Sequence, residues 1–143
     1  MKIALASDHA GFPLKEVIKK YLKEHEVTDF GCFNEESMDY PDTGFPAAMA
    51  VRDGECERGI LICGTGIGMS IVANKVKGIR ASLCHCEEFA ILTRKHNDSN
   101  MLTLPGRFLD ENIAIKIVDA WLNTEFENGR HQKRIDKISA REI

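Results

Sequence analysis

Residues 59–75 read Gly-Ile-Leu-Ile-Cys-Gly-Thr-Gly-Ile-Gly-Met-Ser-Ile-Val-Ala-Asn-Lys, and this stretch decides the fold. The apolar run 60–62 is rich in β-branched residues, which is typical of a strand buried on both faces of a parallel sheet. Glycines then alternate through Gly64, Gly66 and Gly68, and apolar residues resume at helical spacing from Ile67. The stretch therefore predicts a buried strand, a glycine turn, and a helix that begins inside the turn.

Such a turn is suited to binding an anion, because glycines let the backbone approach a ligand and the N–H groups at a helix start lack intrahelical partners. The spacing matches neither the dinucleotide fingerprint nor the phosphate loop of nucleotidases. Its distinctive feature is the thiol of Cys63, which ends the strand directly before the turn. The alternative is a purely structural cysteine, since free cysteine is among the most buried residue types.

Length and composition limit the class of protein. With 143 residues, 43% of them hydrophobic, we expect a single domain over residues 1–143. The net charge of -3 argues against a general nucleic-acid binder. No apolar run is long enough to span a membrane, and the N-terminal apolar stretch breaks at Asp8, too soon for a signal peptide. We therefore expect a cytoplasmic protein with neither a nucleic-acid nor a membrane partner.

The cysteine pattern argues against both a disulfide framework and a metal site. The five cysteines form an odd set without a Cys-x-x-Cys pair. Cys84-His85-Cys86 is spaced more tightly than the usual structural zinc pairs, and no second pair follows it. The sequence therefore predicts no metal.

Strand-like and helix-like segments alternate along the chain. We expect strands at 2–6, 26–30, 60–63, 78–84 and 101–104, and helices at 13–22, 45–52, from 67 onward, at 87–95 and at 110–123. Residues 32–44 are expected to form a polar loop. The inward-facing residues of the last two helices are expected to be Phe89, Ala90, Leu92, Ile113, Ile117, Ala120 and Trp121. This order predicts a single-domain, Rossmann-like three-layer α/β/α sandwich, with a five-stranded parallel sheet, helices on both faces and a C-terminal helical tail.

Candidate binding residues gather at one edge of that sheet, because ligands of open α/β sheets bind outside the carboxyl ends of the strands. Asp8 and His9 follow the first strand, the glycine turn follows the central strand, and Arg107 follows the fifth. In the tail, Arg130 and Arg134 are four residues apart and share a helix face. Arginine forks suit a phosphate. The alternatives are a solvated basic face for the tail and a helix cap for His9.

Five motifs, in order along nearly the whole chain, resemble the bacterial type B ribose-5-phosphate isomerases, a family that includes the galactose-6-phosphate isomerase subunits. The motifs are Ser7-Asp8-His9-Ala10-Gly11, Asp39-Tyr40-Pro41-Asp42, the stretch 59–75, Arg94-Lys95-His96-Asn97-Asp98-Ser99-Asn100 and Gly129-Arg130-His131-Gln132-Lys133-Arg134. The resemblance implies that the protein interconverts ribose 5-phosphate and ribulose 5-phosphate through a cis-enediolate, with no cofactor and no metal.

The resemblance also implies roles for individual residues. Cys63 matches the base that moves a proton between C2 and C1, with the hydroxyl of Thr65 close by, and His96 matches the residue that opens the sugar ring. Substrate-binding positions match Asp8, His9, Tyr40, Gly64, Gly66, Gly68, Asn97, Arg107, Arg130 and Arg134, among which His9 and the three arginines match phosphate-binding positions. Some relatives carry a glutamate base one turn into the loop helix. This chain has Met69 there, which leaves Cys63 as the base.

The direction of the helices predicts that the active site needs two chains. Cys63 ends a strand, whereas His96 follows the helix 87–95, which carries it about 13 Å toward the opposite edge of the sheet. Because a general acid must come within hydrogen-bond reach of its substrate, we expect a second subunit to supply His96. The resemblance likewise implies a homodimer or a dimer of dimers with the site at the interface. A His96 that only caps its own helix is the alternative.

Three classes of function remain open from the residues alone. A sugar-phosphate isomerase explains the thiol, the glycine turn, His96 and the arginines together. A non-catalytic phosphate- or nucleotide-binding module explains only the turn and the arginines. A thiol redox protein explains Cys63 but lacks a resolving cysteine. Within the first class, a six-carbon substrate such as galactose 6-phosphate or allose 6-phosphate is the alternative to ribose 5-phosphate.

Overall fold

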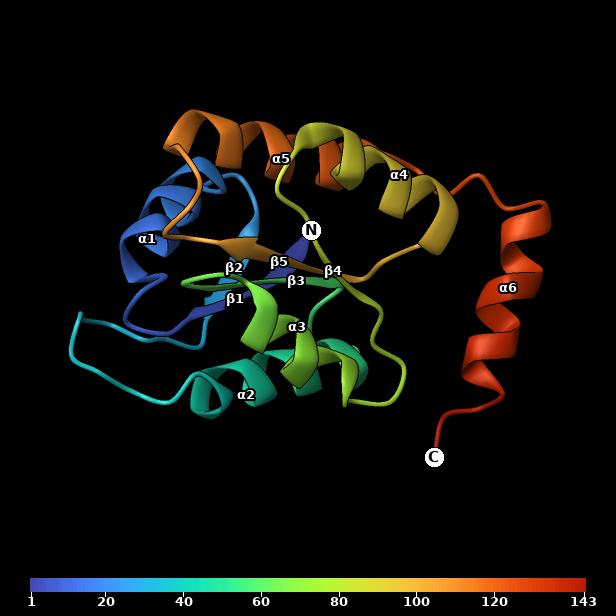
Figure 1. Ribbon diagram of the computed structural model, residues 1–143, viewed down its shortest axis with the longest axis horizontal. Helices are drawn as coiled ribbons and strands as arrows, with labels where there is room; N and C mark the ends of the chain where they lie inside the picture. The colour runs from blue at the N-terminus through green and yellow to red at the C-terminus, as the bar shows by residue number, and fades with distance from the viewer.

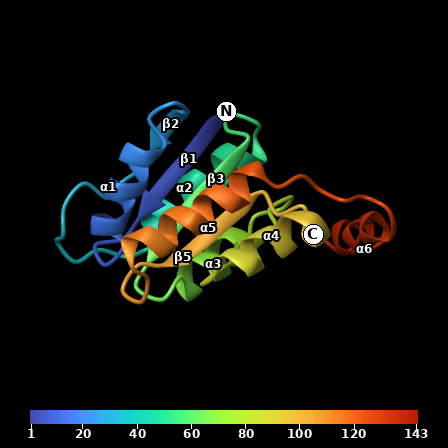
Figure 2. The same cartoon turned by 90° about the horizontal axis from the view of Figure 1, so that it is seen from above.

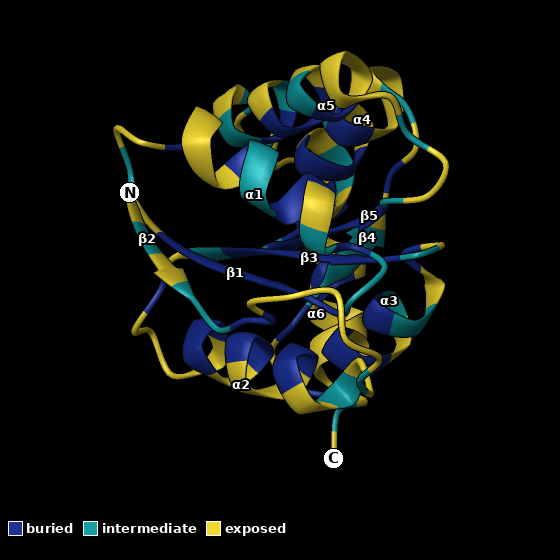
Figure 3. Cartoon of the chain, turned by 90° about the vertical axis from the view of Figure 1, so that its left-hand side faces the viewer, coloured by how far each residue is buried: buried dark blue, intermediate teal, exposed yellow.

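Five parallel strands form the middle layer of the computed structural model, which describes residues 1–143 (Figure 1). The strands are β1 (Lys2–Ser7), β2 (Glu26–Asp29), β3 (Arg58–Cys63), β4 (Ala81–Leu83) and β5 (Met101–Pro105). Their order across the sheet is β2-β1-β3-β5-β4, and every neighbouring pair is parallel. The central strands β1, β3 and β5 are almost entirely buried, as Figure 3 shows.

Helices cover both faces of the sheet. They are α1 (Phe12–Tyr21), α2 (Pro41–Arg52), α3 (Ile67–Asn74), α4 (Glu87–Asn97), α5 (Glu111–Asn123) and α6 (Arg130–Ser139). One face carries α1, α4 and α5 and the other carries α2 and α3, whereas α6 stands beside the three layers and packs mainly against α4 (Figures 1 and 2). None of these helices combines the length and apolarity needed to cross a bilayer. The predicted α/β/α sandwich with a helical tail is confirmed.

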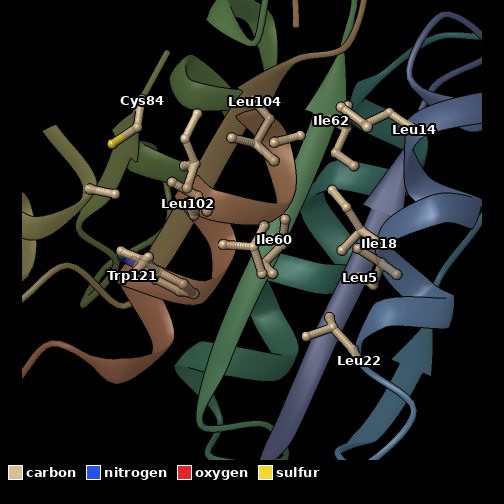
Figure 4. Close-up of a cluster of buried hydrophobic side chains, with 14 of the residues drawn as sticks. Leu5, Leu14, Ile18, Leu22, Ile60, Ile62, Cys84, Leu102, Leu104 and Trp121 are labelled. Atoms are coloured by element: carbon tan, nitrogen blue, oxygen red, sulfur yellow. The ribbon is translucent and has the colours of Figure 1, made fainter. Parts of the chain in front are cut away.

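Two hydrophobic clusters fill the spaces between the layers. Side chains alternate along β3, so that Ile60 and Ile62 face α1 and α5 while Leu61 and Cys63 face α2 and α3. Trp121 of α5 is fully buried in the first cluster, and its indole Nε1–H donates a hydrogen bond to Ser99 Oγ over 2.9 Å (Figure 4). This bond satisfies the polar edge of the largest side chain in the core.

Several predicted boundaries differ from the structure. Helix α2 begins at Pro41, so the end of the predicted loop 32–44 is helical, with Pro41 in the first turn, where its missing N–H costs nothing. Strand β4 has only three residues because the chain turns at Gly78, which has a φ of +84°. Helix α4 continues through His96 and Asn97 and ends where Asp98 adopts a left-handed conformation with a φ of +45°.

Three residues expected to face inward are exposed: Phe89 at 51%, Leu92 at 37% and Ile113 at 46%. The expectations for Ala90, Ile117 and Trp121 are confirmed, and Ala120 is partly buried against the core. In α4 the buried face consists of Ala90, Thr93 and Arg94 instead. The Arg94 guanidinium is satisfied there by bonds to Asp98 and to the Ser99 and Thr124 carbonyls, so a charged residue occupies a position that periodicity assigns to an apolar one.

A buried ion pair joins α1 to the end of β2. The Nζ atom of Lys15, which is fully buried, lies 2.6 Å from Asp29 Oδ2, and Lys19 Nζ lies 3.0 Å from the same oxygen. Burial opposes ionisation of Asp29, but hydrogen bonds from Lys15, the Gly31 N–H and Lys19 outweigh it and hold the pKa of that carboxyl below its usual value. The carboxylate is therefore the stable form of Asp29 in the folded chain.

An Asp29→Asn substitution should lower the free energy of unfolding by about 3 kcal/mol, because it removes the closest counter-charge of the buried Lys15 ammonium and leaves only the Glu16 carboxylate, 3.5 Å away. Since the folded pKa of Asp29 is depressed, its contribution is present above the unfolded pKa of about 3.9 and is lost as the pH falls through the folded value. Urea titrations from pH 3 to pH 7 measure both effects. The matched control is Asp53→Asn, which removes the exposed pair with Arg52 and should have a much smaller effect. Equal losses for the two variants would contradict this account.

Candidate active site

At the carboxyl ends of β1 and β3 the connections leave the sheet on opposite faces, and we call this edge of the sheet the crevice. The chain passes from β1 into α1 on one face and from β3 into α3 on the other, and β1 and β3 are neighbours. This is the switch point at which open α/β sheets bind ligands. Asp8 and His9 follow β1 here, and the glycine turn follows β3, as the sequence predicts.

The turn between β3 and α3 presents backbone amides to the crevice. Gly66 has a φ of +75°, and a Cβ atom on it would lie 2.9 Å from the carbonyl carbon of Leu104, so this position requires glycine. The N–H groups of Gly64, Thr65 and Gly66 donate no hydrogen bond within the chain. The Thr65 hydroxyl accepts a hydrogen bond from the Ile67 N–H over 3.2 Å and so lies at the start of α3. Three free donors and one hydroxyl therefore surround the point where α3 begins.

Cys63 lies directly before these donors. It is 4% exposed, and its carbonyl accepts a 2.8 Å hydrogen bond from the Gly106 N–H, which ties the end of β3 to the turn after β5. Met69, one turn into α3, is fully buried in the cluster beneath α2. A thioether cannot act as a base, so Cys63 is the residue at this end of β3 that can exchange a proton.

Tyr40 and Arg107 border the glycine turn on two sides. A Cβ atom on Gly68 would lie 2.8 Å from the Tyr40 ring, so the tyrosine covers the first turn of α3. Arg107 donates its backbone N–H to the Gly64 carbonyl over 3.1 Å, and its Nη1 would lie 3.3 Å from a Cβ atom on Gly64. Glycine at 64 and 68 thus lets an aromatic ring and a guanidinium reach the edges of the crevice.

Asp8 and His9 have different surroundings at the end of β1. Asp8 is buried, its N–H donates to the Ile62 carbonyl, and its Oδ1 accepts a 3.0 Å hydrogen bond from the Gly11 N–H. Asp8 therefore shapes the turn. His9 accepts a hydrogen bond at Nδ1 from the Met38 N–H over 3.2 Å and does not cap α1, whose N-cap is Gly11. The imidazole is held by its Nδ1 face, so Nε2 is the atom left to meet a ligand.

The remaining predicted site residues form a second group, away from the crevice. His96 and Asn97, at the end of α4, and Arg130 and Arg134, on α6, line a pocket of about 380 Å³ together with His131. The two arginines share one face of α6, as their spacing predicts. This pocket already combines an imidazole, an amide and two guanidinium groups, which suits a phosphorylated polar ligand.

The two groups lie at opposite edges of the sheet. Helix α4 begins after β4 at the carboxyl edge, and its 11 residues span about 16 Å. The Asn100 carbonyl, just beyond α4, accepts a hydrogen bond from the Gly59 N–H at the start of β3, whereas Cys63 ends the same strand. One chain therefore does not bring His96 to the glycine turn.

Sequence reasoning missed two residues beside His96. The His131 ring stacks on the His96 ring with centroids 4.4 Å apart, and Glu127 Oε1 lies 3.7 Å from His131 Nε2 and 3.8 Å from His96 Nε2. Burial lowers the pKa of His131, and the neighbouring Arg130 and His96 lower it further, while Glu127 opposes them. In the sequence, Glu127 and His131 are four residues apart and next to the tail arginines, and this spacing could have indicated that the two side chains lie together.

Comparisons with known proteins agree over the length of the chain. The family model described as Ribose/Galactose Isomerase matches residues 3–138. Ribose-5-phosphate isomerase B of Escherichia coli (strain K12) is 48% identical over 141 residues, which cover 97% of this chain and 95% of the relative. The structure of Clostridium thermocellum ribose-5-phosphate isomerase B matches with a TM-score of 0.96 and 51% identity, covering 98% and 96% of the two chains. That of ribose-5-phosphate isomerase B from Mycoplasma genitalium, with bound ribulose-5-phosphate, matches with a TM-score of 0.92 and 45% identity, covering 97% and 94%.

Proposed function

This chain belongs to the Ribose/Galactose Isomerase family, and we propose that it interconverts ribose 5-phosphate and ribulose 5-phosphate. The observation that carries the proposal is the thiol of Cys63 directly before three amides that donate no internal hydrogen bond. The relative from Mycoplasma genitalium, whose structure contains ribulose-5-phosphate, supports the choice of a five-carbon sugar. The whole chain, residues 1–143, acts in this proposal as one isomerase domain without a cofactor or a resident metal.

Cys63 serves as the base in the proposed reaction. Its thiolate takes the proton from C2 of the open-chain aldose, and the electron pair moves onto the C1 oxygen to give a cis-enediolate. The C2 hydroxyl then gives up its proton, which passes to the C1 oxygen, and the same thiol returns its proton to C1 while the C2 oxygen becomes the carbonyl of the ketose. The amides of Gly64, Thr65 and Gly66 bond the developing negative oxygen, and removal of one such donor in other enzymes costs about 2.7–4 kcal/mol.

A second subunit completes the site in this proposal. His96 opens the sugar ring and Asn97 binds its hydroxyl groups, but both lie at the edge opposite Cys63 in their own chain. A two-fold axis that sets the pocket between α4 and α6 of one subunit against the crevice of the other creates two equivalent sites. The proposed assembly is a homodimer, alone or paired into a dimer of dimers, acting in the cytoplasm.

In this proposal, residues of both the crevice and the pocket between α4 and α6 bind the phosphate. Arg130 and Arg134 line the pocket on α6, while His9 and Arg107 border the crevice. In this proposal, these four residues bind the phosphate when the two surfaces face one another. Guanidinium forks bind phosphate oxygens in pairs, which favours a phosphorylated sugar over the free sugar.

An assay of the purified protein with ribose 5-phosphate tests this function. We expect ketose formation and, in D₂O, incorporation of solvent deuterium into the sugar. Free ribose should react far more slowly, and galactose 6-phosphate and allose 6-phosphate in parallel reactions report the preferred chain length. Binding of ribose 5-phosphate without conversion would instead favour a non-catalytic binding module.

A further inference from the structure

The segment that ends α4 is bound by a side chain from another part of the chain. Arg80 directly precedes β4, and its guanidinium reaches the two residues at the end of α4. Its Nε donates a hydrogen bond to the Asn97 carbonyl over 2.9 Å, and its Nη2 donates one to the Asp98 carbonyl over 2.8 Å. One planar guanidinium therefore binds two consecutive carbonyls.

These carbonyls need a donor because α4 ends there. The last carbonyls of a helix have no N–H partner within the helix. Asp98 also has a φ of +45°, a left-handed conformation that residues with a side chain rarely adopt. A guanidinium at this end supplies the missing donors and complements the negative end of the helix dipole. The conformation of the turn therefore depends on Arg80.

Further bonds join Arg80 to the same segment. The Asp98 carboxylate lies between two guanidinium groups, 2.8 Å from Arg94 Nη1 and 3.6 Å from Arg80 Nη2. The Arg80 N–H donates to Asn100 Oδ1 over 2.8 Å, and the Asn100 N–H donates to the Arg80 carbonyl over 3.1 Å. Residues 97–100 are thus tied to Arg80 through both its side chain and its main chain.

Arg80 does not line the pocket between α4 and α6, whereas His96 and Asn97 do. It bonds the main chain of Asn97, so a shift at this point displaces the amide side chain and the neighbouring imidazole together. We propose that Arg80 is a positioning residue of the isomerase, which holds the end of α4 so that His96 and Asn97 meet the sugar. The inference rests on the proposed function. The alternative is a helix cap without any effect on catalysis.

Steady-state kinetics of Arg80→Gln with ribose 5-phosphate test this role. We expect kcat to fall by about ten- to hundredfold, because a misplacement of about 1 Å costs catalysis up to about that factor. KM should change far less, since Arg130 and Arg134 on α6 are untouched. Arg80→Lys keeps the charge without the fork and should recover only part of kcat. The matched control is Arg52→Gln, which removes an exposed arginine paired with Asp53 and should leave both constants unchanged. A wild-type kcat in Arg80→Gln would contradict the proposal.

Hydrogen exchange reports on the end of α4 without any substrate. In the intact protein the N–H groups of Asp98 and Ser99 donate to carbonyls of α4, and the Arg80 side chain holds this turn. In Arg80→Gln, exchange at 98–99 should accelerate by about tenfold or more, whereas exchange in β3 and the glycine turn should not change. Unchanged exchange at 98–99 would overturn the proposal, and so would faster exchange throughout the sheet, which indicates general destabilisation.

Subunit mixing distinguishes positioning of His96 from damage elsewhere in the site. Arg80→Gln impairs the half of the site that carries His96, so mixed dimers with Cys63→Ala contain one intact site, and about a quarter of the wild-type activity should return. Mixed dimers with His96→Ala contain none and should show no gain. A gain with both partners or with neither, under conditions where Cys63→Ala and His96→Ala restore each other, would refute the positioning role. A wild-type protein without isomerase activity would refute the proposed function and leave the exchange test of Arg80 standing.

Discussion

A Cys63→Ala variant is expected to lose turnover of ribose 5-phosphate by a factor of about 10²–10⁴, the range supplied by a positioned general base. The thiol ends β3 directly before the free amides of the glycine turn, and Met69 offers no base to replace it. Exchange of the C2 proton with D₂O should fall in parallel, because both measurements depend on the same proton abstraction. The affinity for ribose 5-phosphate, measured by calorimetry, should change little.

Cys56→Ala is the matched control for this variant. Cys56 is also buried, but it lies in the turn before β3, away from the crevice, and burial raises the pKa of its thiol. Burial likewise raises the pKa of Cys84 to about 12. Burial therefore disfavours the thiolate at both positions, and because Cys56 also lies away from the crevice, we expect the control to retain its turnover. Near-normal activity in Cys63→Ala would place the base elsewhere.

Mixing inactive Cys63→Ala with inactive His96→Ala protein should restore activity. If each site takes Cys63 from one subunit and His96 from the other, every mixed dimer contains one intact site and one site without either group. Such a dimer should have about half the activity of the wild-type dimer. Random exchange at equal concentrations makes about half of the dimers mixed, so about a quarter of the wild-type activity should return.

Native mass spectrometry of the mixture gives the fraction of mixed dimers against which activity is scaled. Each variant incubated with itself through the same exchange procedure is the control and should remain inactive. If a sample proven to contain mixed dimers regains no activity, His96 and Cys63 of the same chain act together in one site. That outcome would conflict with the opposite edges that the two residues occupy.

The sequence predicted the turn between β3 and α3 well because its determinants are local. A buried strand, alternating glycines and the start of a helix are neighbours along the chain, and parallel strands necessarily bring their carboxyl ends to one edge. The same reasoning predicted that Asp8 and His9 follow the carboxyl end of β1. The end of α4 was harder to place, since Asp98 closes the helix in a left-handed conformation that no glycine marks.

The failures arose where tertiary contacts override periodicity. Phe89 and Leu92 are apolar at positions where the helix faces outward, while Arg94 is buried because the carbonyls of Ser99 and of Thr124, which is distant in sequence, accept its N–H groups. The stacking of His131 on His96 likewise depends on how α6 returns to α4. Such contacts join segments that no local pattern connects, so the sequence alone could not reveal the stacking of these two imidazole rings.

The position of α6 beside the layered body bears on how substrate range evolves in this family. The proposed base ends a strand of the sheet and the turn amides follow it directly, whereas Arg130 and Arg134 stand on a helix that packs mainly against α4. Under the proposed function, substitutions between α4 and α6 would therefore move the arginines proposed to bind phosphate and leave the turn after Cys63 in place. We expect such changes to alter the length of the sugar phosphate that is accepted without replacing the base.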